Sequence, residues 1–151
     1  PSTFMEWSAD MAQATMAQMV SLISEGVFDK YPGLRVALLE CGVSWLPHLM
    51  WRFDKNYKAL RSEIPWVTRL PGEYIRRHFR FSSQPLERPE QLDHLLHIFD
   101  IIDAEQTLMF GSNYPRWDTD WPAETLSLLP ERLRQRIMAD NAADLFRLDT
   151  R

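Results

Sequence analysis

The sequence predicts an α/β fold built on a parallel sheet, and three observations support this prediction. Three short apolar runs alternate with longer segments in which apolar residues recur every three or four positions. Each apolar run stops at small or polar residues before the next helical pattern begins. Strands that alternate with helices pair in parallel through right-handed crossovers. The chain of 151 residues is long enough for one domain with a hydrophobic core, so residues 1–151 form a single segment.

The helical segments are predicted from periodicity and from start and stop signals. An amphipathic helix is expected from about Ser8 to Asp29, ended by Tyr31-Pro32-Gly33. A second helix starts at Ser44, which is a good N-cap, with Pro47 in the first turn, where a missing N–H costs nothing. The other expected helices cover 73–78, the stretch from Pro89 to Ile102, 123–129 and 131–146.

The strands are predicted at Leu34–Leu39, at Phe79–Phe81, where the signal is weak, and at Thr107–Phe110. The first run is nearly continuous in apolar residues, which is typical of a strand buried on both faces. A sheet of three strands leaves two edges unpaired, which soluble proteins avoid. We therefore expect that something covers those edges, or that another chain or residues outside this segment complete a larger sheet.

Polar residues follow each predicted strand at the point where it ends. Glu40 follows the first strand, Gln84 the second and Asn113 the third. Adjacent parallel strands end at the same edge, so these side chains are expected to face one rim, where α/β proteins bind ligands. The alternative is that they only satisfy loop backbone. Glu40 in particular needs a metal, an arginine or backbone N–H groups as a partner, and Arg35, Arg52 and Arg116 are the candidate arginines.

Histidine and cysteine give little support for a metal site within the chain. His94 and His97 lie three apart on a predicted helix, where an exposed face is the simpler interpretation. His48, in an early helical turn, is the one histidine placed where it could overhang the rim, and a surface position is the simpler interpretation for it as well. There is no His-x-His, His-Glu-x-x-His or cysteine pair. The single cysteine, Cys41, fits a small buried thiol in a reducing compartment.

A polar and aromatic loop follows the third strand. One interpretation makes Trp117 one wall of a pocket. The alternative is that the loop only leads into the next helix, with Asp118 or Asp120 as its cap, and this alternative is favoured for Asp120.

Bulk properties exclude several classes of function. The net charge of −4 gives no electrostatic case for binding nucleic acid or an anionic membrane. No apolar run approaches the ~18 residues of a membrane span, and the first residues lack the features of a signal peptide. A cytoplasmic protein is expected. Because the chain begins with Pro1 and leads almost directly into a helix, it looks like a segment or a processed product.

Several spaced motifs together resemble the amidohydrolase-related family, whose members are metal-dependent hydrolases and decarboxylases on a (β/α)₈ TIM barrel. The motifs, in chain order, are Glu40-Cys-Gly-Val-Ser-Trp-Leu-Pro47, Trp51-Arg-Phe-Asp54, Gln84-Pro-Leu-Glu87, Phe110-Gly-Ser-Asn-Tyr-Pro-Arg-Trp-Asp118 and Asn141-Ala-Ala-Asp-Leu-Phe146. The resemblance covers nearly the whole chain and implies the C-terminal half of such a barrel, with strands six, seven and eight. It also implies a divalent metal such as zinc and a small-molecule substrate.

The chain departs from the family pattern at the residues that matter for chemistry. The family's last-strand motif reads Ser-Asp-Tyr-Pro-His, and its Asp binds the metal, but this chain has Asn113 there and Arg116 at the His position. An amide carries no charge and accepts no proton at neutral pH, and a fixed cation opposes a metal and favours an anion. The first-strand His-x-His and the fifth-strand His lie outside this chain. Glu40 stands where some relatives carry a His near the metal.

The resemblance therefore implies an incomplete and impaired metal site. Asn113 and Glu40 are the weak candidates for catalysis and metal binding, and Arg116, Trp117, Gln84 and His48 are the candidates for substrate binding. This chain alone is expected to hold no catalytic metal and to be inactive. Completion by a missing N-terminal half would restore an enzyme. The alternative is a non-catalytic binding or interaction module that self-associates through its open sheet edges.

Overall fold

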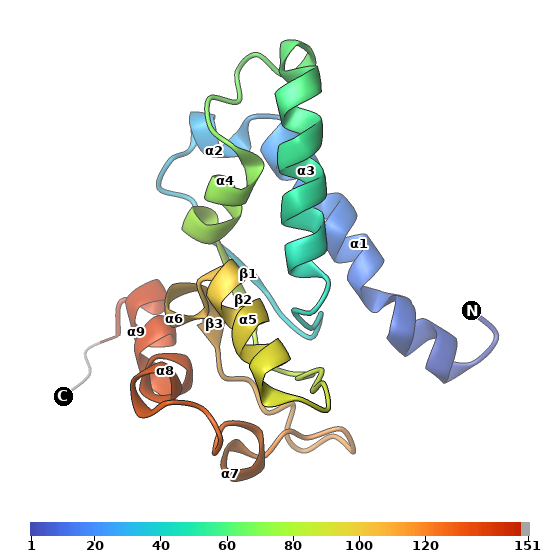
Figure 1. The fold of residues 1–151 in the computed structure, drawn as a ribbon, viewed down its shortest axis with the longest axis vertical. Coiled ribbons are helices and arrows are strands. Elements are labelled where there is room, and N and C mark those ends of the chain that lie inside the picture. The colour runs from blue at the N-terminus through green and yellow to red at the C-terminus, as the bar shows by residue number, and fades with distance from the viewer. Residues whose placement is uncertain (149–151) are drawn as a thin grey trace.

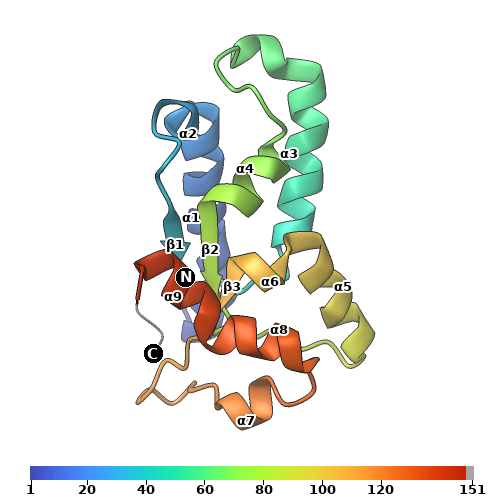
Figure 2. The same cartoon turned by 90° about the vertical axis from the view of Figure 1, so that its left-hand side faces the viewer.

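The computed structural model describes residues 1–148, and it confirms the parallel α/β arrangement. The strands β1 (Val36–Leu38), β2 (Phe79–Ser82) and β3 (Leu108–Met109) form one sheet in the order β1-β2-β3. Both pairs are parallel, with Val36 opposite Phe79 and Phe81 opposite Leu108. The strands lie in the middle of the molecule, and all three run toward the same rim (Figure 1, Figure 2).

Helices pack against parts of this short sheet and leave the β1 side partly open. They are α1 (Phe4–Ser24), α2 (Val27–Lys30), α3 (Leu46–Leu60), the short η1 (Arg61–Glu63), α4 (Pro71–His78), α5 (Leu92–Ile102), α6 (Ala104–Thr107), α7 (Pro122–Thr125), α8 (Glu131–Gln135), the π-helical turn η2 (Arg136–Asp140) and α9 (Asn141–Phe146). In Figure 1 the N-terminal half of α1 reaches away from the sheet toward the lower right, and α7 to α9 gather at the lower left.

The first helix differs from the predicted range of 8–29 at both ends. It begins at Phe4, because Thr3 and Glu6 form a capping box in which each side chain accepts a hydrogen bond from the other residue's backbone N–H. It ends before Gly26, whose φ of 69° lies in the left-handed region and separates α1 from α2. A Cβ at Gly26 would lie 2.4 Å from the Trp66 ring, so the residue also permits a close approach.

Other helix boundaries also differ from the prediction. The α5 helix begins at Leu92 and not at Pro89, and α7 covers only Pro122–Thr125 of the stretch expected to reach 129. Thr107 does not start the third strand but ends α6, where its hydroxyl donates to the carbonyl of Ile102 at 2.9 Å. The long closing helix predicted over 131–146 is present as α8, η2 and α9 in direct succession.

The start of α3 corrects the predicted N-cap at Ser44. The helix begins at Leu46, and no side chain caps it. Instead the Glu87 carboxylate accepts from the backbone N–H groups of Val43 and Ser44, at 2.9 and 2.7 Å. Gly42 makes room for this arrangement, because a Cβ there would lie 2.6 Å from the Glu87 carboxylate. Glu87, which lies 43 positions beyond Ser44, therefore holds the loop that leads into α3.

The prediction that the first strand is buried on both faces is wrong. Within β1, Ala37 is exposed, and Leu39 beyond its end is 64% exposed. The reason is that β1 lies at the edge of the sheet and pairs only with β2 among the described residues. The apolar run predicts burial, but part of its surface is open to solvent in residues 1–148.

The opposite edge of the sheet is closed by the C-terminal helices. The backbone N–H of Phe110 donates to the carbonyl of Ile137 in η2 at 2.8 Å. The side chain of Asn141 donates to the carbonyls of Leu108, at 2.7 Å, and of Ala104, at 3.3 Å. The helical segment thus takes hydrogen bonds that a neighbouring strand would take, so one of the two edges predicted to be uncovered is covered by this chain itself.

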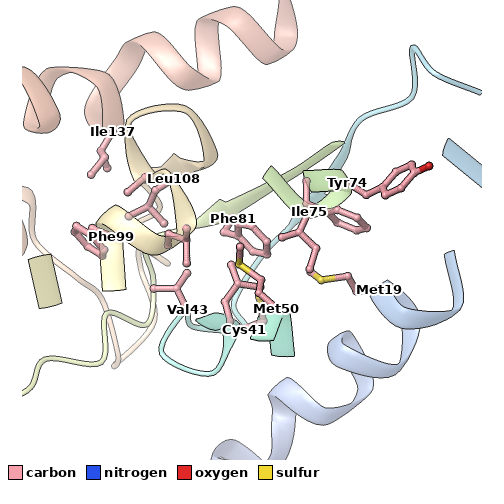
Figure 3. Packing of buried hydrophobic residues seen from close by; sticks show 14 of the residues in the cluster. Met19, Cys41, Val43, Met50, Tyr74, Ile75, Phe81, Phe99, Leu108 and Ile137 are labelled. Atoms are coloured by element: carbon pink, nitrogen blue, oxygen red, sulfur yellow. The ribbon is translucent and has the colours of Figure 1, made fainter. Parts of the chain in front are cut away.

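One hydrophobic core runs across the sheet (Figure 3). Phe81 of β2 is fully buried at its centre, between a group that includes Met19 and Ile75 and a group that includes Leu108 and Ile137. Burying side chains of this size stabilises a fold by about 1.5–3 kcal/mol each, so the core holds the strand ends in place.

Candidate functional site at the strand rim

The ends of the three strands bring the predicted polar residues to one rim. Glu40 follows β1, Gln84 follows β2 and Asn113 follows β3. Glu40 and Asn113 both have left-handed backbone, with φ of 57° and 56°. This conformation is uncommon outside glycine, although Asn tolerates it better than most residues. The loop beyond Asn113 folds back toward the rim, where Asp118 meets the side chains of Asn113 and Gln84.

Asp118 connects these residues, although the sequence suggested only a helix cap for it. Its carboxylate oxygens accept from the Asn113 side-chain nitrogen at 3.1 and 3.2 Å. The Gln84 side-chain nitrogen donates to the Asp118 backbone carbonyl at 3.2 Å and approaches its carboxylate at 3.4 Å. The side-chain amide of Asn113 therefore donates to Asp118, which is the second carboxylate at the rim after Glu40 and lies five residues further along the chain.

Arg116 lies between the two acids of the rim. Its Nη1 is 3.4 Å from a Glu40 carboxylate oxygen, and its Nε is 3.6 Å from one of Asp118. The interpretation of Glu40 as the partner of an arginine thus holds for Arg116 and not for Arg35 or Arg52. Two carboxylates offset the guanidinium charge, which weakens the sequence-based argument that Arg116 by itself attracts an anion.

A cavity of about 210 Å³ lies between this rim and the N-terminal half of α1. Its polar lining comes from Glu40, Gln84, Glu87, Arg116 and Asp118. Its aromatic lining comes from Phe4, Trp7 and Trp117. The predicted pocket wall, Trp117, is 81% exposed and packs edge-on against Phe4, with ring centroids 6.1 Å apart. The small volume suits a ligand well below drug size.

The remaining candidates lie elsewhere. His48 is exposed on α3 and is not among the cavity-lining residues, and His94 and His97 are exposed on α5, as expected. Cys41 is buried as predicted, and burial raises the pKa of its thiol to about 11, so the thiolate is scarce at neutral pH.

Asp120 does not cap the following helix, and neither does Asp118. The α7 helix begins at Pro122 without a side-chain cap, and the Asp120 carboxylate accepts from the backbone N–H of Leu86 at 3.1 Å. The loop after β3 is therefore tied to the loop after β2 through both acids. Sequence reasoning missed this role and that of Glu87, because these contacts join segments more than thirty residues apart.

The described residues do not by themselves form a set of metal ligands. Within residues 1–148, no three His, Cys, Asp or Glu side chains gather closely enough to hold a metal ion. Asn113 directs its nitrogen at Asp118, and the Arg116 cation separates Glu40 from Asp118. In the same part of the chain, no helix is long and apolar enough to cross a membrane.

Comparison with known proteins places this geometry in a family. Residues 4–148 match the model of the family described as amidohydrolase. The gamma-resorcylate decarboxylase of Rhodococcus jostii is 28% identical over 149 residues, which cover 91% of this chain and 41% of that protein. The one from Rhizobium radiobacter is 29% identical and covers 93% and 42%.

Solved structures agree with this result. A dihydroxybenzoic acid decarboxylase from Polaromonas sp. JS666, with bound manganese and the inhibitor 2-nitroresorcinol, matches with a TM-score of 0.71 and 27% identity, over 93% of this chain and 42% of that one. An amidohydrolase from Mycobacterium avium subsp. paratuberculosis matches with a TM-score of 0.73 and 25% identity, over 89% and 33%. The chain spans about two fifths of the length of the curated relatives that it matches. It forms part of a TIM barrel and belongs to the amidohydrolase family.

Proposed function

We propose that this chain is the C-terminal part of an amidohydrolase-family enzyme that decarboxylates a small aromatic acid. The observation that carries the proposal is the convergence of Glu40, Gln84 and the Asn113–Asp118 pair on one rim, beside a cavity walled by tryptophans. This rim is where barrel enzymes of this kind hold their substrates. The names of the decarboxylase relatives support the choice of reaction.

The contribution of this chain is to bind and orient the substrate. The exposed faces of Trp7 and Trp117 offer a surface on which an aromatic ring can stack. The linked polar groups beneath them present hydrogen-bonding atoms in fixed positions. Fixed groups accelerate a reaction more than mobile ones, because less ordering is needed when the substrate reacts.

The divalent metal of the family belongs to the proposal only for a completed barrel. The Polaromonas relative contains manganese, and such an ion polarises a substrate oxygen when it is bound. In this chain the described residues offer no complete ligand set, so we assign them no step through a metal. Because Asn113 carries no charge and accepts no proton, we further propose that this chemistry is impaired relative to a protein with Asp at that position.

The proposal is tested in the longest natural polypeptide that carries residues 1–151. We expect it to release CO₂ from 2,6-dihydroxybenzoate, a substrate class named for a relative from Rhizobium, and to need Mn²⁺ to do so. Trp117→Ala should raise KM, because it removes the stacking wall. The exposed His94→Ala is the matched control and should leave the rate unchanged. A polypeptide that binds Mn²⁺ and the acid but releases no CO₂ would overturn the proposal.

A further inference from the structure

The outward face of α3 carries only positive charge. Its exposed charged side chains are Arg52, Lys55 and Lys58, and none of the three forms an ion pair among the described residues. The one acid of the helix, Asp54, is half-buried and accepts from the backbone N–H of Gly72 at 2.7 Å. Like charges three positions apart destabilise a helix, so the stability of α3 itself does not explain this spacing.

The outward face of α5 carries the opposite charge. Asp93 and Asp100 are exposed, lie seven positions apart on one face, and share the helix with no Lys or Arg. Neither carboxylate forms an ion pair within residues 1–148. Asp93 favours the helix from its first turn, but Asp100 lies in the last turn, where a carboxylate opposes the helix dipole. The stability of α5 itself therefore does not explain the acid at position 100.

The two helices are neighbours on the same side of the molecule. α3 contacts α5, and α3 lies above α5 in both views, along the right-hand side in Figure 2. At about 1.5 Å per residue, Arg52 and Lys58 are about 9 Å apart along α3, and Asp93 and Asp100 are about 10 Å apart along α5. A two-fold rotation that places α3 of one copy on α5 of another therefore matches opposite charges, and it does so twice.

Trp51 gives this face an apolar anchor. Its side chain is 62% exposed and directly precedes Arg52 on α3. Tryptophan and arginine are enriched among the residues that contribute most of the binding energy in protein interfaces. A (β/α)₈ barrel keeps its helices in an outer ring, so this face stays accessible when further strands join the sheet.

We propose that α3 and α5 form a self-complementary interface, through which two copies of this chain pair about a two-fold axis. The three cations on α3 of one copy then lie against Asp93 and Asp100 of the other, and Trp51 is buried between them. A face of two helices is at the small end of protein interfaces, so we expect a dissociation constant in the micromolar range. The inference does not depend on the proposed reaction, because none of these residues lines the cavity at the strand rim.

The experiment is sedimentation velocity on the longest natural polypeptide that carries residues 1–151. We expect the mass to rise from one chain to two between about 1 and about 100 µM protein. The rise should move to higher protein concentration when NaCl is increased from about 0.05 to about 0.5 M, because salt screens exposed charge pairs. This part of the test needs no variant.

Charge reversal then identifies the surface. Lys55→Glu places an acid against the carboxylates of α5 and should weaken pairing at least about tenfold, and Asp100→Lys should weaken it similarly. The double variant restores opposite charges across both halves of the two-fold interface and should regain most of the affinity. Lys30→Glu is the matched control, because Lys30 is exposed on α2 and the change in net charge is the same. Circular dichroism checks that each exposed substitution leaves the fold intact.

Three results would overturn the inference. The first is a chain that stays monomeric at the highest concentration, which would leave the α3 face for an acidic partner of another kind. The second is pairing that neither single reversal weakens, which would point to the open β1 edge. The third is a double variant that pairs no better than the single ones, because α3 and α5 would then not face each other. CO₂ release is measured independently, so the proposed reaction can fail while the pairing holds, and the reverse.

Discussion

At the scale of single residues, the Asn113–Asp118 pair predicts what happens when the family's acid is restored. In Asn113→Asp the donor that faces Asp118 at 3.1 Å becomes a second carboxylate. We expect the variant to lose on the order of 1 kcal/mol of stability at neutral pH, because like charges replace a hydrogen bond at a partly exposed site. Two adjacent carboxylates take up a shared proton above the range of an isolated one, so the loss should shrink as the pH falls toward 4.

The control for this prediction exchanges the two residues. The double variant Asn113→Asp, Asp118→Asn again pairs one amide with one acid, so urea unfolding at pH 7 should show much of the stability regained. If Asn113→Asp alone unfolds like the wild type at both pH values, the pair has no energetic role.

The sequence predicts Asn113 as a strand-end residue in the family's acid position, but it does not predict the hydrogen bond of Asn113 to Asp118. The sharp turn that brings Asp118 back depends on the left-handed backbone at Asn113 and on contacts with the loop after β2.

At the scale of elements, the loop that leads into α3 is held by a carboxylate from a distant loop. Replacing Glu87 by Ala leaves the N–H groups of Val43 and Ser44 without their acceptor, which should cost about 1–2 kcal/mol. Glu87→Gln keeps an acceptor oxygen and should lose less. The measurement is urea unfolding followed by circular dichroism, with the exposed Glu90→Ala as the control. An equal effect of the alanine variants at positions 87 and 90 would contradict the assignment.

The same element shows which part of the fold was predictable. Periodicity located α3 and the proline in its first turn, because both depend on neighbours along the chain. The predicted N-cap at Ser44 is wrong, because α3 begins at Leu46 without a side-chain cap and Ser44 lies in a loop that Glu87 holds from 43 positions further along the chain. In α1 the missed signal is local. The Thr3 and Glu6 capping box is visible in the sequence and predicts a helix start near Phe4 instead of Ser8.

At the scale of the whole molecule, the two sheet edges differ. Within residues 1–148 the edge at β3 is occupied by Ile137 and Asn141, whereas β1 has a partner on one side only. A strand edge left free is a place where further chain can pair. The chain covers about two fifths of its relatives, so the open β1 edge is where we propose that the rest of a barrel joins. Self-association through the same edge stays a prediction, which light scattering tests.

The stability of the molecule should depend on pH through His78, which joins three elements of the fold. The buried ring stacks on Phe28 of α2 with centroids 4.4 Å apart, and its Nδ1 lies 2.9 Å from the carbonyl of Leu34. Burial lowers the pKa of His78, and the nearby charges of Arg35 and Arg77 lower it further, whereas the Leu34 carbonyl and Asp29 raise it. Below the ordinary histidine pKa of about 6.5, the unfolded chain therefore binds the proton more readily than the folded one.

The expected result is a melting temperature that falls as the pH decreases from 7 to 5, since protonation in that window favours the unfolded state. His78→Gln should flatten the fall, because it removes the titrating group, although its melting temperature at pH 7 should be lower for loss of the ring stacking. The exposed His94→Gln is the matched control and should keep the wild-type slope. A wild-type slope that persists in His78→Gln would show that other groups control acid unfolding and that the burial of this ring has no effect on it.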